Sequence, residues 1–232
     1  MNNLELRPTY TVVVPAAGVG SRMQANVAKQ YLKINGKTII EYTIERLLSH
    51  NKINKVVVAI AAHDSIFKTL PLSQDSRVEV VIGGAERSDS VLSGLNACKD
   101  NDWVLVHDAA RPCVTHDDIN ELIAFCEKKQ QGAILATPVR DTMKRSNDSE
   151  QILHSEDRSN LWHAQTPQMF NALQLKKALN SALLEQHKIT DEASAIEFAG
   201  LPSHIVSGRE DNIKITRPSD LNMAAFILKQ QQ

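Results

Sequence analysis

The sequence has few cysteines and aromatic residues, and it has no long apolar run. Its three cysteines, Cys98, Cys113 and Cys126, are odd in number and include no Cys-x-x-Cys pair, which argues against a disulfide framework or a zinc site. No apolar run approaches the roughly 18 residues that a membrane span needs. Residues 1–18 lack the basic start and long apolar stretch of a signal peptide. We therefore expect a protein of the reducing cytoplasm that has no membrane partner.

An excess of charge of either sign is also absent. Lys and Arg together number 26 and Asp and Glu number 27, so the formal net charge is −1 at pH 7. This balance excludes a generally basic protein that coats nucleic acid. The 232 residues are 42% hydrophobic, which is enough for a core without metals or disulfides. We expect a single domain over residues 1–232 and no nucleic-acid partner.

Short apolar runs alternate with longer amphipathic stretches, a pattern typical of α/β proteins. The runs are rich in Val and Ile without polar alternation, which favours strands covered on both faces. The predicted strands are residues 11–15, 55–61, 78–82, 103–107 and 132–138, and the predicted helices are residues 39–49, 88–97 and 116–129. The pattern therefore predicts an α/β fold with a mostly parallel sheet and helices on both faces.

The alternation breaks after residue 138. Residues 141–155 are polar, with a turn-forming Asn147-Asp148-Ser149 between two short extended arms, which predicts a hairpin. Such a hairpin has little core of its own, so we expect it to project and to pack on something else. Helices are predicted again over residues 172–186 and 192–199, then a strand over 204–207 and a last helix with Pro218 in its first turn.

The first predicted strand leads into a loop of small residues, Pro15, Ala16, Ala17 and Gly18, followed by Arg22. Parallel sheets bind ligands at the carboxyl ends of their strands, and small side chains let phosphate oxygens approach backbone N–H groups. Arg22 would add a bidentate cation. The loop has neither the Gly-Lys-Ser/Thr of a P-loop nor the third glycine of a dinucleotide fingerprint. A simple tight turn is the alternative interpretation.

Lys29 follows seven residues after Arg22, in a segment that still reads as polar loop. Two cations beside a small-residue loop could neutralise a triphosphate whose charge grows as pyrophosphate departs. A lone surface lysine is nearly always just solvated, so the pairing carries this hypothesis.

The ends of the third and fourth predicted strands carry further polar groups. Gly84 permits close approach of the backbone, and Ser90 lies in a cluster that opens a helix, although Ser88 acting as a simple N-cap explains that cluster about as well. Asp108, followed by Ala109, is a natural ligand for Mg²⁺, which prefers one or two carboxylates plus phosphate oxygens. The neighbouring His107 reads as a buried histidine whose hydrogen bonds are satisfied.

Residues 208–216 form the last polar block. Lys214, on a predicted short apolar strand, could reach the same pocket, and Asp211 could share the metal. Together the strand ends predict a phosphate-handling site assisted by Mg²⁺, and they leave the substrate open.

The motifs are more specific together than apart, and they run in one order from about Thr11 to Leu221. They are Pro15-Ala16-Ala17-Gly18-x-Gly20-x-Arg22-Met23, Lys29-Gln30-Tyr31-Leu32, Gly83-Gly84-x-x-Arg87-x-x-Ser90-Val91, Val106-His107-Asp108-Ala109-Ala110-Arg111-Pro112, Asp141-Thr142, Thr166-Pro167-Gln168, Thr190-Asp191-Glu192 and Asn212-Ile213-Lys214-Ile215-Thr216. This pattern resembles that of the 2-C-methyl-D-erythritol 4-phosphate cytidylyltransferases of the non-mevalonate isoprenoid pathway. The resemblance implies a Rossmann-like, nucleotidyltransferase-like fold, with a projecting β-arm over residues 139–160 that is exchanged between the subunits of a homodimer.

The resemblance also implies a reaction in which CTP and the polyol phosphate give 4-diphosphocytidyl-2-C-methyl-D-erythritol and pyrophosphate, with Mg²⁺ on the triphosphate. In-line attack on the α-phosphorus leaves positioning and charge neutralisation to supply most of the rate. The implied catalytic residues are Arg22, Lys29, Arg158 and Lys214. The implied nucleotide-binding residues are Pro15, Ala16, Ala17, Gly18, Gly84, Ser90, Asp108 and Ala109. The implied substrate-binding residues are Asp108, Arg111, Thr142, Arg158, Thr166, Thr190 and Lys214, and the implied metal ligands are Asp108 and Asp211.

Three alternatives to this function need to be weighed. A cytidylyltransferase that acts on another polyol phosphate, such as ribitol 5-phosphate, would share much of this pattern. A regulatory protein that binds nucleotide without turnover is disfavoured by the presence of Arg22, Lys29 and Lys214. A bifunctional fusion with the cyclodiphosphate synthase of the same pathway is not expected, because the sequence ends at Gln232.

Overall fold

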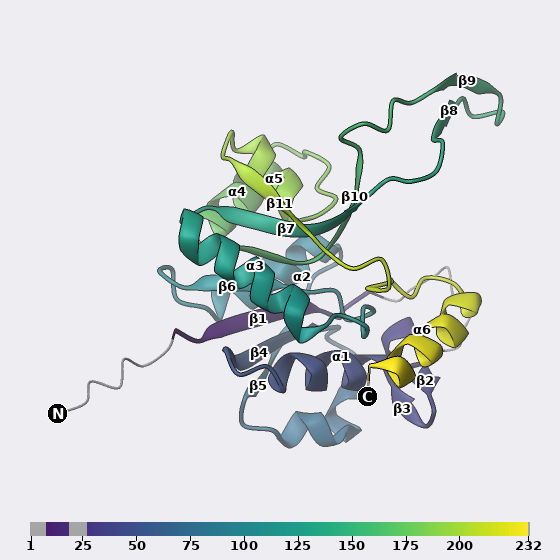
Figure 1. Ribbon diagram of the computed structural model, residues 1–232. Helices are drawn as coiled ribbons and strands as arrows, with labels where there is room; N and C mark the ends of the chain where they lie inside the picture. The colour runs from purple at the N-terminus through teal and green to yellow at the C-terminus, as the bar shows by residue number, and fades with distance from the viewer. Residues whose placement is uncertain (1–7, 19–26, 232) are drawn as a thin grey trace.

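The computed structural model describes residues 8–18 and 27–231 (Figure 1). The strands are β1 (Tyr10–Pro15), β2 (Lys33–Ile34), β3 (Lys37–Thr38), β4 (Ile53–Ile60), β5 (Val78–Ile82), β6 (Trp103–Val106), β7 (Gly132–Pro138), β8 (Lys144–Ser146), β9 (Ile152–Ser155), β10 (Trp162–Asn171) and β11 (Ser203–Ser207). The helices are α1 (Ile39–Leu48), α2 (Arg87–Asn96), α3 (His116–Lys129), α4 (Ala172–Leu184), α5 (Glu192–Phe198) and α6 (Pro218–Gln230), with short 3₁₀ turns at Lys29–Tyr31, Phe67–Thr69 and Pro71–Gln74.

A central seven-stranded sheet organises the chain, in the order β11-β7-β10-β6-β1-β4-β5. Neighbouring strands are parallel except at β10, which runs antiparallel to both β6 and β7. Helices cover both faces of the sheet, so the predicted fold class is confirmed (Figure 1).

Helix α3 shows how local sequence sets the limits of an element. The Thr115 hydroxyl accepts a hydrogen bond from the Asp118 N–H at 3.2 Å, and the Asp118 carboxylate accepts one from the Thr115 N–H, also at 3.2 Å. This reciprocal cap satisfies N–H groups that have no partner inside the helix. Gln130 ends the helix in the left-handed region, with φ 53°. The observed bounds of α3, β5 and β7 match the predicted ranges, because each depends on neighbours in the sequence.

Alternate residues of β1 serve the two faces of the sheet. Val12 and Val14 pack in one buried cluster with α1 and α3, whereas Val13 packs in a second cluster with α2, α4 and α5. Helix α2 lies so close to the sheet that a Cβ at Gly94 would overlap Val13 Cγ1. The alternation follows from the two-residue period of a strand.

Strand β10 was not predicted, and the short strand predicted around Lys214 was wrong. The sequence of β10 has polar residues where a buried strand normally has apolar ones. The buried Gln168 is satisfied because its amide donates to Asp191 Oδ2 at 2.9 Å and accepts from the Ala193 N–H at 3.0 Å. The segment around Lys214 is a loop, which the Ile215 N–H ties to the Ala110 carbonyl at 2.9 Å. Both features depend on contacts made at long range.

The polar hairpin was predicted correctly, and it is formed by β8 and β9. Residues 140–155 are all exposed in this single chain, and Figure 1 shows the hairpin projecting away from the central sheet. The Asn147 side chain organises the turn by accepting hydrogen bonds from the backbone of Ser149 and Gln151, at 3.2 and 3.0 Å. In the part of the chain that the structure describes, no helix is long and apolar enough to cross a membrane.

Candidate active site

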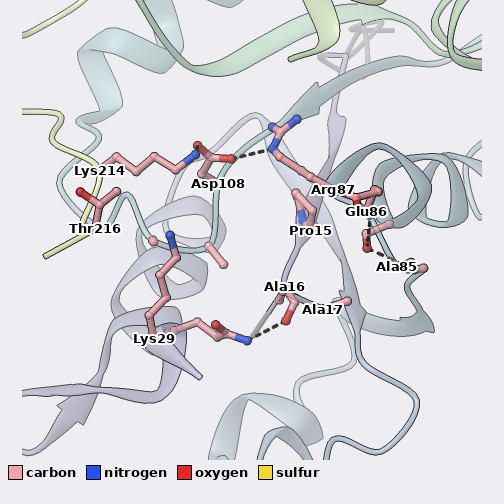
Figure 2. A pocket seen from close by; sticks show the side chains of 16 residues that line it. Pro15, Ala16, Ala17, Lys29, Ala85, Glu86, Arg87, Asp108, Lys214 and Thr216 are labelled. Atoms are coloured by element: carbon pink, nitrogen blue, oxygen red, sulfur yellow. Dashed lines mark hydrogen bonds and ion pairs between the residues drawn. The ribbon is translucent and has the colours of Figure 1, made fainter. Parts of the chain in front are cut away.

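Two cavities lie at the carboxyl ends of the parallel strands. The first, of about 300 Å³, is lined by the loop after β1, the start of α2, the residues after β6 and Lys214 (Figure 2); we call it the loop cavity. The second, of about 200 Å³, is lined by residues of β10 and of the segment before α5; we call it the β10 cavity. Arg87, Asp108 and Lys214 line both cavities, so the two spaces meet at these charged residues.

The loop cavity brings together most of the residues that the sequence singled out. Its backbone wall is held by the Ala16 N–H, which donates to the Ala59 carbonyl at 2.7 Å, and by the Gln30 amide, which donates to the Ala16 carbonyl at 2.7 Å. The sequence-predicted residues that line it are Pro15, Ala16, Ala17, Gly18, Lys29, Gly84, Ser90, Asp108, Ala109 and Lys214. The predicted Arg22 lies outside the described residues.

Gly84 and Ser90 form a compact corner of the loop cavity. The Ser90 hydroxyl accepts from the Gly84 N–H at 3.2 Å and donates to the Glu86 carbonyl at 3.2 Å. A Cβ at Gly84 would overlap the Asp89 side chain, so this position favours glycine for lack of space. Helix α2 begins at Arg87, and Ser88 therefore lies inside its first turn rather than at the N-cap. The simple N-cap interpretation of Ser88 is wrong.

Asp108 is the ionic centre of the site. Its Oδ1 lies 3.0 Å from Arg87 Nε, and its Oδ2 lies 2.8 Å from Lys214 Nζ and 3.4 Å from Arg111 Nε. Burial by itself would raise the pKa of Asp108, but the positive charges of Arg87, Lys214 and Arg111 hold it well below its usual range. The ionised carboxylate therefore holds Arg87 and Lys214 beside both cavities and Arg111 beside the β10 cavity.

Sequence reasoning missed the ion pair between Arg87 and Glu192. Arg87 Nη1 and Nη2 donate to the two carboxylate oxygens of Glu192, at 2.6 and 3.1 Å. The Glu192 side chain is 1% exposed, and charged residues are rarely buried unless they are paired. Both residues lie in motifs that carry the family resemblance, and that resemblance was the only signal, because the pairing joins two segments far apart in the chain.

The β10 cavity is lined by Arg111, Thr166 and Thr190, three of the residues that the resemblance implies for substrate binding. The Thr166 hydroxyl accepts from the Asp108 N–H at 3.0 Å, and its carbonyl accepts from the Asn212 side-chain amide at 2.9 Å. Arg111 Nη1 donates to the Asn212 carbonyl at 2.7 Å. Asn212, which sequence reasoning did not assign to the site, thus joins β10 to the loop that carries Lys214.

His107 is a buried residue that contacts two residues of the β10 cavity, Arg111 and Thr166. Its ring nitrogens lie 2.9 Å from the Arg111 carbonyl and 3.0 Å from the Thr166 hydroxyl, and the side chain is fully buried. Burial lowers the pKa of His107 to about 4. The interpretation of His107 as a satisfied buried histidine is confirmed.

Three predicted residues lie away from both cavities in the single chain. Thr142 and Arg158 are exposed in and beside the hairpin, and the Arg158 guanidinium donates to the Arg140 carbonyl. Asp211 lines neither cavity, and Arg209 donates to both of its carboxylate oxygens, at 2.8 and 2.6 Å. That Asp211 shares a metal with Asp108 stays a prediction.

Asp108 lines both cavities, at a place where Mg²⁺ could bind. Three cations already surround it, and no group of three His, Cys, Asp or Glu residues in the described ranges could hold a metal ion. This donor set does not suit a resident metal. The site does suit a Mg²⁺ ion that is already bound to a triphosphate, because such an ion takes most of its ligands from water and phosphate oxygens.

The fold and the two cavities define a class of protein, the α/β enzymes that bind nucleotide phosphates at the carboxyl edge of a parallel sheet. The family model of 2-C-methyl-D-erythritol 4-phosphate cytidylyltransferase matches residues 10–230. A protein of that name from Tolumonas auensis is 56% identical over 224 residues, which are 97% of this chain and 98% of that protein. The chain belongs to the 2-C-methyl-D-erythritol 4-phosphate cytidylyltransferase family.

Solved structures agree with this assignment. A crystal structure of a 4-diphosphocytidyl-2C-methyl-D-erythritol synthase superimposes with a TM-score of 0.83 and 33% identity, and the match covers 96% of this chain and 100% of that one. The 2-C-methyl-D-erythritol 4-phosphate cytidylyltransferase of Francisella tularensis gives a TM-score of 0.80 and 36% identity, over 94% of this chain and 99% of that one.

Proposed function

We propose that the loop cavity binds CTP and that the β10 cavity binds the phosphate end of 2-C-methyl-D-erythritol 4-phosphate. The chain then transfers the cytidylyl group to form 4-diphosphocytidyl-2-C-methyl-D-erythritol and pyrophosphate. One observation carries this proposal: the two cavities share Arg87, Asp108 and Lys214. Two phosphate groups that must react with each other would meet at this shared ionic centre.

The loop cavity suits a pyrimidine nucleotide. Pro15, Ala16, Ala17 and Gly18 present backbone groups and little side-chain bulk, and Gly84, which also lines this cavity, adds no side chain. Base, ribose and phosphates would be held mainly by backbone groups, with Ser90, Asp108 and Ala109 beside them. A larger purine would be excluded by space and by polar groups left unpaired.

The chemical step is an in-line displacement. A phosphate oxygen of the polyol phosphate forms a bond to the α-phosphorus of CTP, and the bond from that phosphorus to the bridging oxygen breaks, so pyrophosphate leaves with the electron pair. Lys214, held by Asp108, orients the attacking phosphate, and Arg111, Thr166 and Thr190 line its side. No covalent enzyme intermediate is needed, so the chain supplies positioning and charge.

Lys29 and Arg22 are the cations that we assign to the triphosphate of CTP. Lys29 lines the loop cavity, and Arg22 follows the same loop in sequence. Cations aimed at the α-phosphate and at the departing pyrophosphate stabilise charge that grows in the transition state. Mg²⁺ bound to the triphosphate would neutralise part of the same charge, with Asp108 as a candidate protein ligand.

The hairpin gives a reason to propose a homodimer. It makes few contacts with the rest of its own chain, and it leaves the side chains of Ile152 and Leu153 60% and 58% exposed. Packing on a second subunit would cover these two apolar side chains. The exchanged arm, residues 139–160 of one single domain, would carry Thr142 and Arg158 to the partner's β10 cavity. A guanidinium there could bind the attacking phosphate through two hydrogen bonds.

The three cysteines are free and buried, which is consistent with our proposal of a reducing cytoplasm.

The direct test is a pyrophosphate-release assay with mass-spectrometric detection of the product. We expect turnover with CTP and 2-C-methyl-D-erythritol 4-phosphate, and much slower turnover when ATP replaces CTP. Ribitol 5-phosphate is the matched alternative acceptor, and equal turnover with it would favour the broader polyol phosphate interpretation. Nucleotide binding without turnover of any pair would overturn the proposal in favour of a regulatory protein.

A further inference from the structure

The Arg87 guanidinium joins three separate segments at the boundary of the two cavities. It begins α2, its Nε edge contacts Asp108 Oδ1 at 3.0 Å, and its other edge contacts both oxygens of Glu192, the first residue of α5. A planar guanidinium has donors on both edges in fixed directions, so one contact determines the orientation of the other. Lysine cannot reproduce this geometry.

Glu192 is the anchor of this arrangement. Its side chain is 1% exposed, whereas that of Arg87 is 28% exposed and borders both cavities. A carboxylate buried this deeply binds its cation strongly, because the protein interior screens charge less than water does. The Glu192 end of the guanidinium is therefore fixed, and the Nε end is aimed at Asp108.

The contact between Arg87 and Asp108 Oδ1 determines which cations the second carboxylate oxygen, Oδ2, can contact. Arg87 occupies Oδ1, so Oδ2 is left to face Lys214 at 2.8 Å and Arg111 at 3.4 Å. Without this restraint the carboxylate could rotate, and Arg87 could compete with Lys214 for the same oxygen.

We propose that Glu192 is a positioning residue, which acts through Arg87 to hold Asp108 in the orientation that sets the place of Lys214. This inference rests on the proposed function, in which Lys214 orients the attacking phosphate. Glu192 itself need not touch either substrate. Its removal should therefore affect the reaction step more than substrate binding.

The first experiment compares Glu192→Gln with wild type. We expect kcat to fall about 10- to 100-fold, because small displacements of orienting groups cost rates of this size. The KM values for CTP and for the acceptor should change much less, which marks loss of an interaction made in the transition state. Glu127→Gln is the matched control: Glu127 also has an ion pair, with Lys52 at 3.1 Å, and a hydrogen bond from Tyr10 at 2.6 Å, but it lines neither cavity. Its kcat should equal that of wild type.

A double variant separates positioning from a purely structural role. Arg87→Gln should lower Tm most, since it leaves the Glu192 charge buried and unpaired. Arg87→Gln combined with Glu192→Gln should regain much of that Tm, because neutral partners replace a broken buried pair. We expect kcat to stay low in the double variant. Recovery of both Tm and kcat would overturn the inference, because the pair would then serve only the fold.

Glu192→Asp covers the case in which the amide variant does not fold. It keeps the charge but withdraws the carboxylate by one methylene, so we expect a Tm near that of wild type and a reduced kcat. A wild-type kcat in folded Glu192→Asp or Glu192→Gln would overturn the positioning role while leaving the proposed function intact. A wild-type protein that makes no product from CTP and the polyol phosphate would overturn both.

Discussion

Lys214 Nζ lies 2.8 Å from Asp108 Oδ2, although the two residues belong to segments far apart in the sequence. Both residues line the loop cavity and the β10 cavity, and Figure 2 shows their side chains pointing toward one another. A cation held there by a buried carboxylate is already in place before substrates bind. Preorganisation of this kind reduces the rearrangement that the reaction needs.

This relationship predicts the behaviour of Lys214→Gln. We expect kcat to fall about 10²–10³-fold, which is the typical effect of removing one well-placed donor. Tm should change little, because Arg87 and Arg111 still neutralise Asp108. Steady-state kinetics and a thermal melt on the same preparation check both statements. A normal kcat in a folded variant would contradict the role of Lys214.

The position of Lys29 in the loop cavity predicts a different kinetic signature. Lys29→Met should lower kcat about 10²–10³-fold while CTP binding weakens much less, because charge on the departing group builds up late in the reaction. Lys33→Met is a matched control, since Lys33 is exposed and lines neither cavity. Raised KM for CTP with a normal kcat would assign Lys29 to ground-state binding instead.

Arg158 supplies a test of arm exchange. If each site takes Lys29 from one chain and Arg158 from the other, inactive Lys29→Met and Arg158→Ala homodimers should regain activity when their subunits exchange. A mixed dimer has one intact site and one site with both lesions. Random mixing should therefore restore about a quarter of wild-type activity, given a symmetric two-fold dimer. If mass spectrometry shows exchange and activity stays at the level of the single variants, Arg158 does not act across the interface.

His50 predicts how stability depends on pH. It is 3% exposed, its Nδ1 accepts from the Lys52 N–H at 3.2 Å, and burial lowers its pKa below the usual 6.5. Below pH 6.5 the unfolded chain takes up a proton that the folded chain resists, so the free energy of unfolding should fall as the pH falls. One such group contributes a slope of at most about 1.4 kcal/mol per pH unit.

The measurement for His50 is urea unfolding at several pH values in wild type and in His50→Gln. The variant should have a shallower slope between pH 6.5 and 5. Some slope should remain, because His107, whose pKa is lowered to about 4, is buried in both proteins. Parallel curves for the two proteins would show that His50 is protonated equally in the folded and unfolded states.

Local sequence was sufficient for much of the fold. The bounds of α3 follow from the cap between Thr115 and Asp118, and Val12, Val13 and Val14 determine which faces of β1 are buried. Small residues after β1 and an acidic residue after β6 were enough to place Ala16 and Asp108 at one sheet edge. These features depend on periodicity and capping, which act between near neighbours and can be read along the chain.

Only the tertiary structure decided the rest. It inserted the polar strand β10 between β6 and β7, turned the predicted strand at Lys214 into a loop, and paired Asp211 with Arg209. It also joined Arg87 to Glu192. These outcomes depend on which distant segments the sheet order makes neighbours, and on the cost of burying a charge or an amide without a partner. Neither quantity is visible along the chain, because both arise only when the strands are assembled.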